Sequence, residues 1–423
     1  MGVRLMKVDV AIIGAGPAGL SAAATIAGRG LSTAVIDEGA EPGGRLLGQV
    51  HELPAADGTT HLWNGPRVAA ELGADVTKAG ARFCLRSVVW GLFPGWRIVL
   101  HGQGPQEIEA RYLVLATGAM MRSLAVPGWT LPGVVTVGAA QMLVNHHRVL
   151  PGRRAIVIGI DLLSLAVAQQ MSAAGVKVEG VVMPPPGPLA GEASEPKRVV
   201  DELLRLATWA PSSGVRLAGR LLHGHRASDL VASVFPRGGI KVWDIPVMPR
   251  RAALEIRGND TVHSVVLADL TTAAEPDMRT AHELEVDVVC TSSSLAPLTE
   301  LPEIAGCTLS HIADLGGYVP LHGPALETTV ETVFVAGSVT GVEDAPTAIL
   351  QGRLAGDAVA HAAGRISDAE HHAHVEQVQT ELADARRHAL PLYPRVREGR
   401  ALLAELWRQA PSRGMDRVSS KEV

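Results

Sequence analysis

Gly14 and Gly16 stand between an apolar run at Val10–Ile13 and a small-residue segment at Ala18–Ala27, and a third glycine, Gly19, is the second residue of that segment. The run predicts a buried parallel strand, and the segment predicts a helix. In such a unit the first glycine permits a tight turn, the second lets backbone approach a pyrophosphate, and the third allows close helix–strand packing. Phosphate then binds the N–H groups at the helix start, so the spacing predicts a dinucleotide site.

A carboxylate follows where such a site requires one. The next predicted strand, Ser32–Ile36, ends at Asp37, about 20 residues after the glycines, where a carboxylate can hold a ribose hydroxyl. Strand, helix, second strand and acid together are much more specific than a glycine pattern alone. The expected fold class is therefore α/β.

Three later segments indicate which dinucleotide is bound. They are Pro42–Gly43–Gly44–Arg45, a strand at Ala110–Leu115 that ends in Ala116–Thr117–Gly118–Ala119, and a strand at Thr332–Val335 that ends in Ala336–Gly337. In this order the motifs resemble the two-dinucleotide-domain flavoproteins, which have the pyridine nucleotide-disulfide oxidoreductase fold. The resemblance covers about residues 7–365. It implies two Rossmann-like domains, the second inserted in the first, with FAD in the first domain.

The resemblance also implies which residues bind FAD, although it assigns no catalytic residue. Ser338 stands where the family has an aspartate for the ribityl chain, so a charge-assisted hydrogen bond worth about 1–2 kcal/mol is lost. A helix that begins near Ala345–Pro346–Thr347 would turn its positive end toward the flavin and stabilise the anionic reduced form. The implied cofactor-binding residues are Gly14, Gly16, Pro17, Ala18, Gly19, Asp37, Glu38, Gly44, Arg45, Ala116, Thr117, Gly118, Gly337, Ser338 and Ala345.

The three cysteines, Cys84, Cys290 and Cys307, limit the redox chemistry. No two of them have the close spacing that a disulfide reductase of this fold needs beside its flavin. An iron–sulfur cluster needs about four thiolates, which this chain does not supply alone. We therefore expect three buried, inert thiols.

The predicted second domain has a degenerate glycine motif. Its strand Ala155–Ile158 leads into Gly159, but Asp161 stands where a nicotinamide-binding domain has glycine. Two unit charges about 4 Å apart near a protein surface repel by about 4 kcal/mol, so a carboxylate there opposes a pyrophosphate. The next strand, Lys177–Val182, ends in Met183–Pro184 instead of a ribose-binding acid. Both observations argue against NAD(P) in this domain.

A flavoprotein without NAD(P)H must receive its electrons from elsewhere. The chain resembles one branch of the family, the FAD subunits of opine oxidase, hydroxyproline dehydrogenase and hydrogen cyanide synthase. This resemblance implies an electron-transfer subunit of a heteromeric amine or amino-acid dehydrogenase or oxidase. Its partners would be a small [2Fe–2S] protein, since residues 366–423 contain no cysteine, and a second FAD-containing, amine-oxidising subunit. The matching segments include Val126–Pro127–Gly128–Trp129, Leu131–Pro132–Gly133–Val134, Gly316–Gly317–Tyr318–Val319–Pro320 and Gln351–Gly352–Arg353–Leu354–Ala355–Gly356.

Two alternatives remain open at this point. The chain could be a stand-alone NAD(P)H-dependent FAD oxidoreductase, or a non-catalytic assembly subunit that retains the fold. The sequence does not indicate which amine is oxidised, which acceptor is used, or the subunit stoichiometry.

Composition and charge agree with an α/β enzyme. The 423 residues are 47% hydrophobic and 19% charged and include 45 glycines, and the net charge of −5 gives no reason to expect nucleic acid. The apolar stretch Ala155–Val167 is too short to span a bilayer, and Met1–Lys7 is too short for a signal peptide. We expect a cytoplasmic protein without a membrane span.

The order of the motifs predicts the domain boundaries. Residues 1–122 and 284–365 form the FAD-binding domain, 123–283 the inserted domain, and 366–423 a helical tail. In the tail, Leu403, Leu406 and Trp407 share one helical stripe, which packs either on the chain itself or on a partner. The His-rich segment Glu370–His374 has no paired ligands at metal spacing, so we expect a solvated helix start and no metal.

Overall fold

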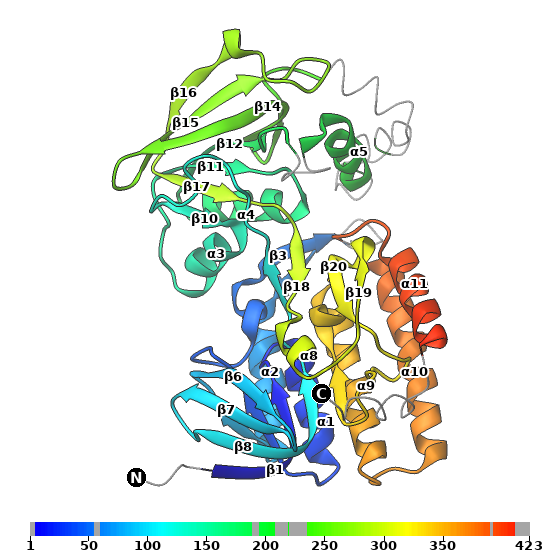
Figure 1. The fold of residues 1–423 in the computed structure, drawn as a ribbon. Coiled ribbons are helices and arrows are strands. Elements are labelled where there is room, and N and C mark those ends of the chain that lie inside the picture. The colour runs from blue at the N-terminus through cyan, green and yellow to red at the C-terminus, as the bar shows by residue number, and fades with distance from the viewer. Residues whose placement is uncertain are drawn as a thin grey trace, which may run out of the picture. The chain divides into compact units, whose positions relative to one another are not determined.

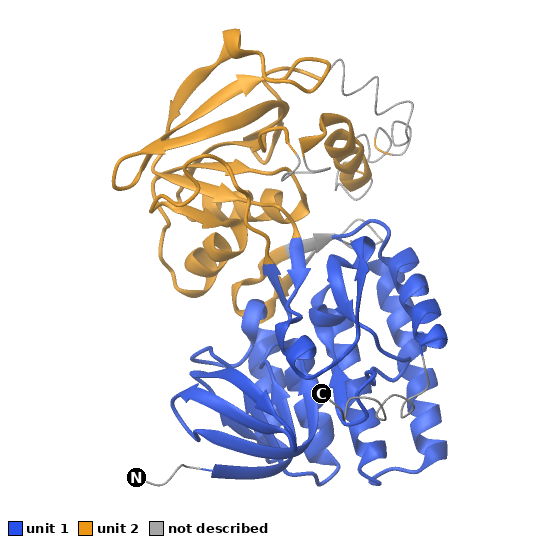
Figure 2. Cartoon of the chain, viewed as in Figure 1, with its two compact units in different colours: residues 1–46, 66–120, 295–423 blue, residues 47–65, 121–294 orange. Residues whose placement is uncertain are grey.

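The computed structural model describes residues 5–54, 60–187, 194–207, 219, 235–389 and 392–410. The chain folds into two compact units (Figure 2). Unit 1 comprises residues 1–46, 66–120 and 295–423, and unit 2 comprises residues 47–65 and 121–294.

Unit 1 contains a sheet in which the described strands follow the order β5-β2-β1-β8-β7-β6, with β21 paired to β8. Figure 1 labels β1, β6, β7 and β8 of this sheet. The pairs among β5, β2, β1, β8 and β21 are parallel, and those among β6, β7 and β8 are antiparallel. The strands are β1 Leu5–Ile13, β2 Thr33–Ile36, β5 Arg82–Cys84, β6 Ser87–Phe93, β7 Arg97–Gly102, β8 Glu107–Leu115 and β21 Val333–Val335.

Apolar residues cover both faces of this sheet because successive strand side chains point to opposite sides. Val10 and Ile12 pack with Leu20 of α1 (Pro17–Gly28) on one face, and Ala11 packs with Ile98 on the other. Burial on both faces explains why Val10–Ile13 of β1 form a continuous apolar run in the sequence.

Two helices of unit 1 pack closely through small residues. A Cβ on Gly352 of α9 (Ala345–Ala362) would lie 2.1 Å from the carbonyl oxygen of Ala18, and one on Gly356 would lie 2.7 Å from Thr25 Cβ. These glycines therefore bring α9 onto α1, beside the start of the first helix.

The C-terminal region is helical, as predicted, with α10 at Asp368–His388 and α11 at Val396–Gln409. Leu403 is 2% exposed and packs in one cluster with Leu315 and Val319 of unit 1, and Leu406 and Trp407 pack against the same cluster. Of the two predicted environments for this stripe, the structure therefore shows packing on the chain itself.

Unit 2 contains a second sheet, whose described strands follow the order β10-β17-β11-β12-β14-β15-β16, with β13 paired to β14. The pairs among β10, β17, β11, β12 and β14 are parallel, and the remaining pairs are antiparallel. The strands are β10 Val134–Thr136, β11 Arg154–Ile158, β12 Lys177–Met183, β13 Ile240–Val242, β14 Ile245–Gly258, β15 Val262–Asp269, β16 His282–Glu285 and β17 Val288–Thr291.

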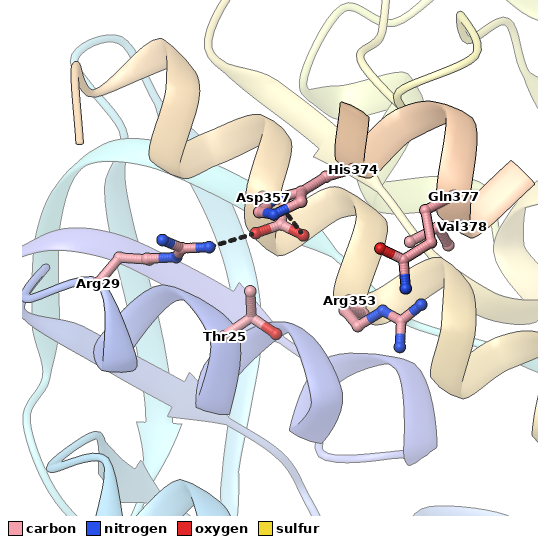
Figure 3. Close-up of a pocket in the computed structure, with 7 residues that line it drawn as sticks. All are labelled: Thr25, Arg29, Arg353, Asp357, His374, Gln377 and Val378. Carbon is pink, nitrogen blue, oxygen red and sulfur yellow. Dashed lines mark ion pairs between the residues drawn. The ribbon is translucent and has the colours of Figure 1, made fainter. Parts of the chain in front are cut away.

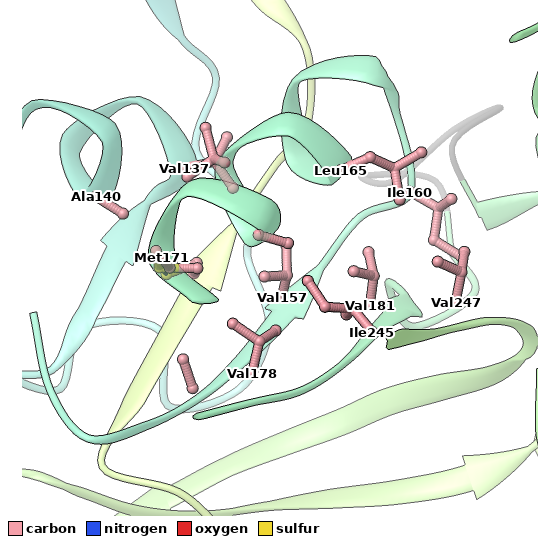
Figure 4. Packing of buried hydrophobic residues seen from close by; sticks show 14 of the residues in the cluster. Val137, Ala140, Val157, Ile160, Leu165, Met171, Val178, Val181, Ile245 and Val247 are labelled. Carbon is pink, nitrogen blue, oxygen red and sulfur yellow. Dashed lines mark hydrogen bonds between the residues drawn. The ribbon is translucent and has the colours of Figure 1, made fainter. Parts of the chain in front are cut away.

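One of the buried apolar clusters of unit 2 lies between this sheet and α4 (Leu162–Ala173). Figure 4 shows Met171 of α4 close to Val157 of β11 and Val178 of β12. All three belong to one buried cluster, so the helix after the degenerate glycine motif is fixed firmly on its sheet.

The observed units differ from the predicted division in four places, because residues 47–65, 121–122 and 284–294 belong to unit 2 and the predicted tail 366–423 belongs to unit 1. Residues 284–294 belong to unit 2, because β17 pairs with both β10 and β11 inside the second sheet. Residues 47–65 also belong to unit 2, since the side-chain amides of Asn145 and Gln170 donate to the carbonyls of Gly48 and Val50 at 2.8 and 3.1 Å.

Shorter elements complete the described chain, and none of its helices combines the length and apolarity that a bilayer crossing requires. The remaining strands are β3 Val50–Pro54, β4 Thr60–Asn64, β9 Ala119–Met121, β18 Leu295–Pro297, β19 Leu309–Ile312 and β20 Gly317–Pro320. The remaining helices are α2 Gly65–Lys78, α3 Val137–Gln141, α5 Pro196–Ala207 and α8 Glu300–Ile304, with short turns η1 Gly44–Gly48, η2 Met142–His146, η4 Met278–Thr280, η5 Ala313–Leu315 and η6 Gly337–Thr340.

Candidate functional site

The glycine turn between β1 and α1 permits only glycine at two positions. Gly14 has φ +106°, and a Cβ there would lie 2.2 Å from the carbonyl oxygen of Ala116. A Cβ on Gly19 would lie 1.8 Å from the carbonyl oxygen of Gly14. Both glycines therefore serve close packing of the chain on itself, as the spacing predicts.

Gly16 is different, because a Cβ there would meet nothing within 4 Å. It is the N-cap of α1, with no capping side chain and no acid in the first turn, and Pro17 occupies the first helical position. The first-turn N–H groups of Ala18 and Gly19 have no intrahelical acceptor at the positive helix end, which is a suitable site for an anion.

Asp37 lies at the end of β2 and bonds to the glycine turn. Its Oδ2 accepts a hydrogen bond from the Ala15 N–H at 2.6 Å, and its Oδ1 accepts one from the Gly39 N–H at 2.7 Å. Each carboxylate oxygen retains further acceptor capacity. The predicted ribose contact remains a prediction, whereas the backbone role of Asp37 was not anticipated. Glu38 is exposed beside it.

The segment after Asp37 folds onto the same turn. The Gly43 N–H donates to the carbonyl of Ala15 at 2.8 Å, and a Cβ on Gly44, which has φ +53°, would lie 3.2 Å from Gly16 Cα. Arg45 follows, and its Nη1 donates to the Ala119 carbonyl at 3.3 Å. Burial lowers the pKa of the Arg45 guanidinium.

The turn after β8 brings in the next predicted residues. The Ala116 N–H donates to the Ile13 carbonyl at 2.8 Å, which places the end of β8 beside the glycine turn. The Thr117 hydroxyl donates to the Leu298 carbonyl at 2.8 Å, and the Leu298 N–H donates to the Gly118 carbonyl at 3.0 Å. Thr117 and Gly118 therefore fix the backbone of the later segment at Leu298.

The late motif meets the first one directly. Gly337 has φ +80°, and its Cβ would lie 2.8 Å from the Cβ of Ala18. Its N–H donates to Oε1 of Gln351 on α9 at 2.7 Å. Half-buried Ser338 follows within η6. The structure thus brings the motifs of β1, β8 and β21 together at one edge of the sheet.

The start of α9 carries an N-cap that was not predicted from the sequence. Asp344 is the N-cap, and its carboxylate accepts the Thr347 N–H at 3.0 Å, so the expected positive helix end is partly occupied. An aspartate directly before Ala345 is the signal that could have revealed this cap. The Thr347 hydroxyl is buried and has no hydrogen-bond partner among the described residues.

The corresponding turn of unit 2 has the same backbone but a different helix start. Gly159 has φ +107°, and a Cβ there would lie 2.0 Å from the Ser292 carbonyl oxygen, just as one on Gly14 would crowd Ala116. Asp161 is the N-cap of α4 and forms a reciprocal capping box with Ser164, at 2.7 and 2.8 Å.

Asp161 is also held from a second side. Its Oδ2 accepts the Ser292 hydroxyl at 2.5 Å. Burial raises the pKa of this carboxyl, although its hydrogen bonds to Ser292 and Ser164 act in the opposite direction. The chain's own carboxyl thus occupies the N-terminus of α4, where a pyrophosphate would bind in a dinucleotide domain.

The three cysteines are buried and free, as predicted. Burial raises the pKa of Cys290 to about 12 and that of Cys307 to about 11. The thiolate forms that redox chemistry needs are therefore suppressed.

A pocket of about 280 Å³ lies away from these motifs, and none of the predicted cofactor residues lines it (Figure 3). Arg29 pairs there with Asp357 at 3.6 Å and with Glu370 at 2.8 Å. Charges facing the pocket are thus mutually compensated. Within the described residues, no group of three or more His, Cys, Asp or Glu side chains is arranged to hold a metal.

The sequence matches the family described as "Pyridine nucleotide-disulphide oxidoreductase" over residues 8–352. It is 30% identical to an opine oxidase subunit of Rhizobium meliloti, across 85% of this chain and 72% of that protein. It is 28% identical to hydrogen cyanide synthase subunit HcnB of Pseudomonas protegens, across 83% and 70%. The fold is similar to the crystal structure of L-proline dehydrogenase from P. horikoshii, with a TM-score of 0.63 and 19% identity over 91% of this chain and 60% of that one.

Proposed function

Because the chain belongs to the pyridine nucleotide-disulphide oxidoreductase family, we propose that it binds FAD in unit 1 and transfers electrons within a heteromeric amine or amino-acid dehydrogenase or oxidase, of which it is one subunit. The observation that carries this proposal is the contrast between two helix starts. Helix α1 begins at Gly16, which has no side chain and where a Cβ would meet nothing within 4 Å, whereas α4 begins at a buried carboxyl. One unit is suited to a pyrophosphate, and the other is filled by the chain itself.

The residues of unit 1 fit FAD. Gly16, Ala18 and Gly19 would hold the pyrophosphate with backbone N–H groups, and Asp37 with Glu38 would bind the ribose. The orphaned Thr347 hydroxyl lies in the first turn of α9, where a bound group would supply its missing partner. When bound, FAD supplies the capacity to accept and pass on electrons. The remaining proposed contacts are Gly14, Pro17, Gly44, Arg45, Ala116, Thr117, Gly118, Gly337, Ser338 and Ala345.

Exclusion of NAD(P) from unit 2 rests on the Asp161 capping box. A pyrophosphate at the start of α4 would have to displace a carboxyl that accepts hydrogen bonds from Ser164 and Ser292. Loss of such a cap costs about 1 kcal/mol before any like-charge repulsion is counted. Electrons would therefore reach the flavin from a partner and not from NAD(P)H.

The proposed partners are a small [2Fe–2S] protein and a second FAD-containing, amine-oxidising subunit. The relatives from opine oxidase and hydrogen cyanide synthase are, by their names, subunits of larger enzymes. The three thiols of this chain are buried, so a cluster in the complex would be bound by a partner.

The test begins with the purified chain and its flavin. We expect yellow protein that releases one FAD on denaturation and that does not bleach with NADH under anaerobic conditions. Gly16→Glu should be colourless yet folded, because its side chain enters open space. The matched control is Gly28→Glu, at the other end of α1, where a Cβ also meets nothing within 4 Å.

The other outcomes separate the alternatives. Rapid bleaching by NADH would identify a stand-alone NAD(P)H-dependent oxidoreductase. A wild-type chain that binds no flavin would identify a non-catalytic role in assembly. Copurification with a second flavoprotein and an iron–sulfur protein would support the electron-transfer role.

A further inference from the structure

The loop between β21 and α9 is fixed by a buried polar network. Oε1 of Gln351 accepts the Gly337 N–H at 2.7 Å and the Thr340 hydroxyl at 3.2 Å. Nε2 of Gln351 donates to Oε2 of Glu343 at 3.4 Å. Gln351 and Thr340 are 2% and 0% exposed, so this network is shielded from water.

Arg400 of α11 reaches into the same network. Its Nη1 donates to the Thr340 carbonyl at 2.8 Å, and its Nη2 donates to the Thr340 hydroxyl at 3.1 Å. Its Nε donates to Oε2 of Glu343 at 2.9 Å. The Arg400 guanidinium therefore binds both the backbone of Thr340 and the carboxylate of Glu343. Among side chains, only the planar guanidinium of arginine offers five N–H donors in a fixed arrangement.

A second arginine completes a buried triad. Nε and Nη2 of Arg386 on α10 donate to the two oxygens of Glu343 at 2.6 and 3.0 Å. The exposed side-chain fractions of Arg386, Glu343 and Arg400 are 18%, 8% and 12%. Within the triad itself, two guanidinium groups and one carboxylate give a net charge of +1, and the next carboxylate along the chain is that of Asp344, which caps α9.

The neighbouring imidazole adds no charge to this surplus. Burial and the nearby guanidinium groups of Arg400 and Arg386 lower the pKa of His322 to about 4, so its ring is neutral at physiological pH. Burial lowers the pKa of Arg400, but Glu343 beside it acts in the opposite direction.

Glycines let α11 approach closely enough for this contact. A Cβ on Gly399 would lie 3.0 Å from both Asp314 Cβ and Leu315 Cγ, and a Cβ on Gly341 would lie 3.1 Å from Nη2 of Arg400. Arg395, one turn before, pairs with Asp314 at 3.1 Å. The helix is thus fixed with Arg400 directed at the loop.

We propose that Arg400 is a positioning residue for the flavin: it fixes the Gly337–Glu343 loop and, together with Arg386, supplies the positive charge that favours the anionic reduced cofactor. This inference rests on the proposed FAD site in unit 1. Helix α11 lies after the last FAD motif in the sequence, and the inference gives it a role in positioning the cofactor. A surplus cation near a flavin stabilises the extra negative charge of its reduced form, so its loss lowers the midpoint potential.

The test compares Arg400→Met, Arg400→Lys and the matched control Arg408→Met in the full chain. Arg400→Met leaves the Glu343–Arg386 pair intact, so it creates no unpaired buried carboxylate. Arg408 is exposed on the same helix about two turns beyond Arg400, and its Nε donates to the Ala404 carbonyl and not to the triad. The readouts are the FAD dissociation constant, the midpoint potential of the bound flavin, and urea unfolding of the apoprotein.

We expect Arg400→Met to weaken FAD binding about tenfold and to shift the midpoint potential to more negative values. Arg400→Lys keeps the positive charge but loses the planar set of N–H donors. It should therefore weaken FAD binding while the midpoint potential of the flavin stays near that of the wild type. Arg408→Met should change neither quantity. A structural role alone would alter stability and leave the potential unchanged.

Wild-type affinity and potential in Arg400→Met would overturn the inference. If that variant does not fold, Arg400→Lys decides, because unchanged affinity in Arg400→Lys would equally reject a positioning role. A wild-type chain that binds no FAD would instead reject the proposed function itself.

Discussion

The Cβ of Ala18 lies 2.8 Å from the position that a Cβ on Gly337 would occupy. This distance is shorter than any ordinary carbon–carbon contact, so the glycine lets the turn after β21 meet the first turn of α1. Two motifs from distant parts of the sequence therefore form one surface only because neither carries a larger side chain at this point.

Gly337→Ala should consequently destabilise the fold and weaken FAD binding. The substitution forces φ +80° on an alanine and crowds Ala18, at a combined cost of about 2 kcal/mol or more. Urea unfolding and visible flavin absorbance measure the two effects. Gly28→Ala, which meets nothing within 4 Å, is the control and should change neither. Full stability in Gly337→Ala would contradict the close approach.

Replacement of Asp161 should open the start of α4. In Asp161→Gly the N-terminal N–H groups lose their internal acceptor, so NADH affinity by calorimetry should rise from undetectable to measurable. Asp161→Asn keeps a side-chain oxygen that can cap α4 but removes the charge, and it should still show no measurable NADH binding. Tight NADH binding by the unmodified chain would show that the cap does not exclude the ligand.

His322 predicts a pH dependence of stability. Its pKa is about 4 in the folded chain and 6.5 in the unfolded one, so the unfolded chain binds more protons between these values. Stability is thus complete above pH 6.5 and falls as the pH drops toward 4, by about 2 kcal/mol at pH 5. For His322→Gln, the free energy of unfolding should not show this decrease between pH 6.5 and pH 4. If the wild type and the variant show the same dependence of unfolding free energy on pH, the lowered pKa of His322 is refuted.

The thiols should not react while the protein is folded. Burial raises the pKa of Cys84, Cys290 and Cys307, and all three side chains are inaccessible. Titration with an aromatic disulfide should detect no reactive thiol in native protein and three after denaturation. A thiol that reacts rapidly in the native state would place one cysteine at the surface.

Local sequence patterns were sufficient for the first motif. The strand before Gly14 and the helix after Gly16 form as predicted, because a continuous apolar run and the glycine spacing are local signals that act over a few residues. The same local logic could have identified the Asp161 capping box, since an acid three residues before Ser164 at a helix start is a recognised cap pattern. The sequence thus predicted that the Asp161 carboxylate would oppose a pyrophosphate, but not that this carboxylate caps α4.

The contacts of Arg386 and Arg400 could not be inferred in this way. Both lie on helices beyond the last flavoprotein motif, and nothing in their spacing indicates that they meet Glu343. The environment of Leu403 was equally undetermined, because an apolar stripe must be buried but does not specify its partner. Such contacts depend on tertiary packing, which a linear pattern does not encode.

The pairing of β8 with β21 has a consequence for biosynthesis. Leu113–Leu115 of β8 hydrogen-bond with Val333–Val335, which the ribosome makes only after residues 121–294. Until then the C-terminal half of β8 presents an open strand edge, the kind of surface on which nascent chains aggregate. Unit 2, whose strands all precede β21, can complete its own sheet during this interval. All strands of the second sheet are therefore synthesised before the first sheet can be completed, although the first unit begins at the N-terminus.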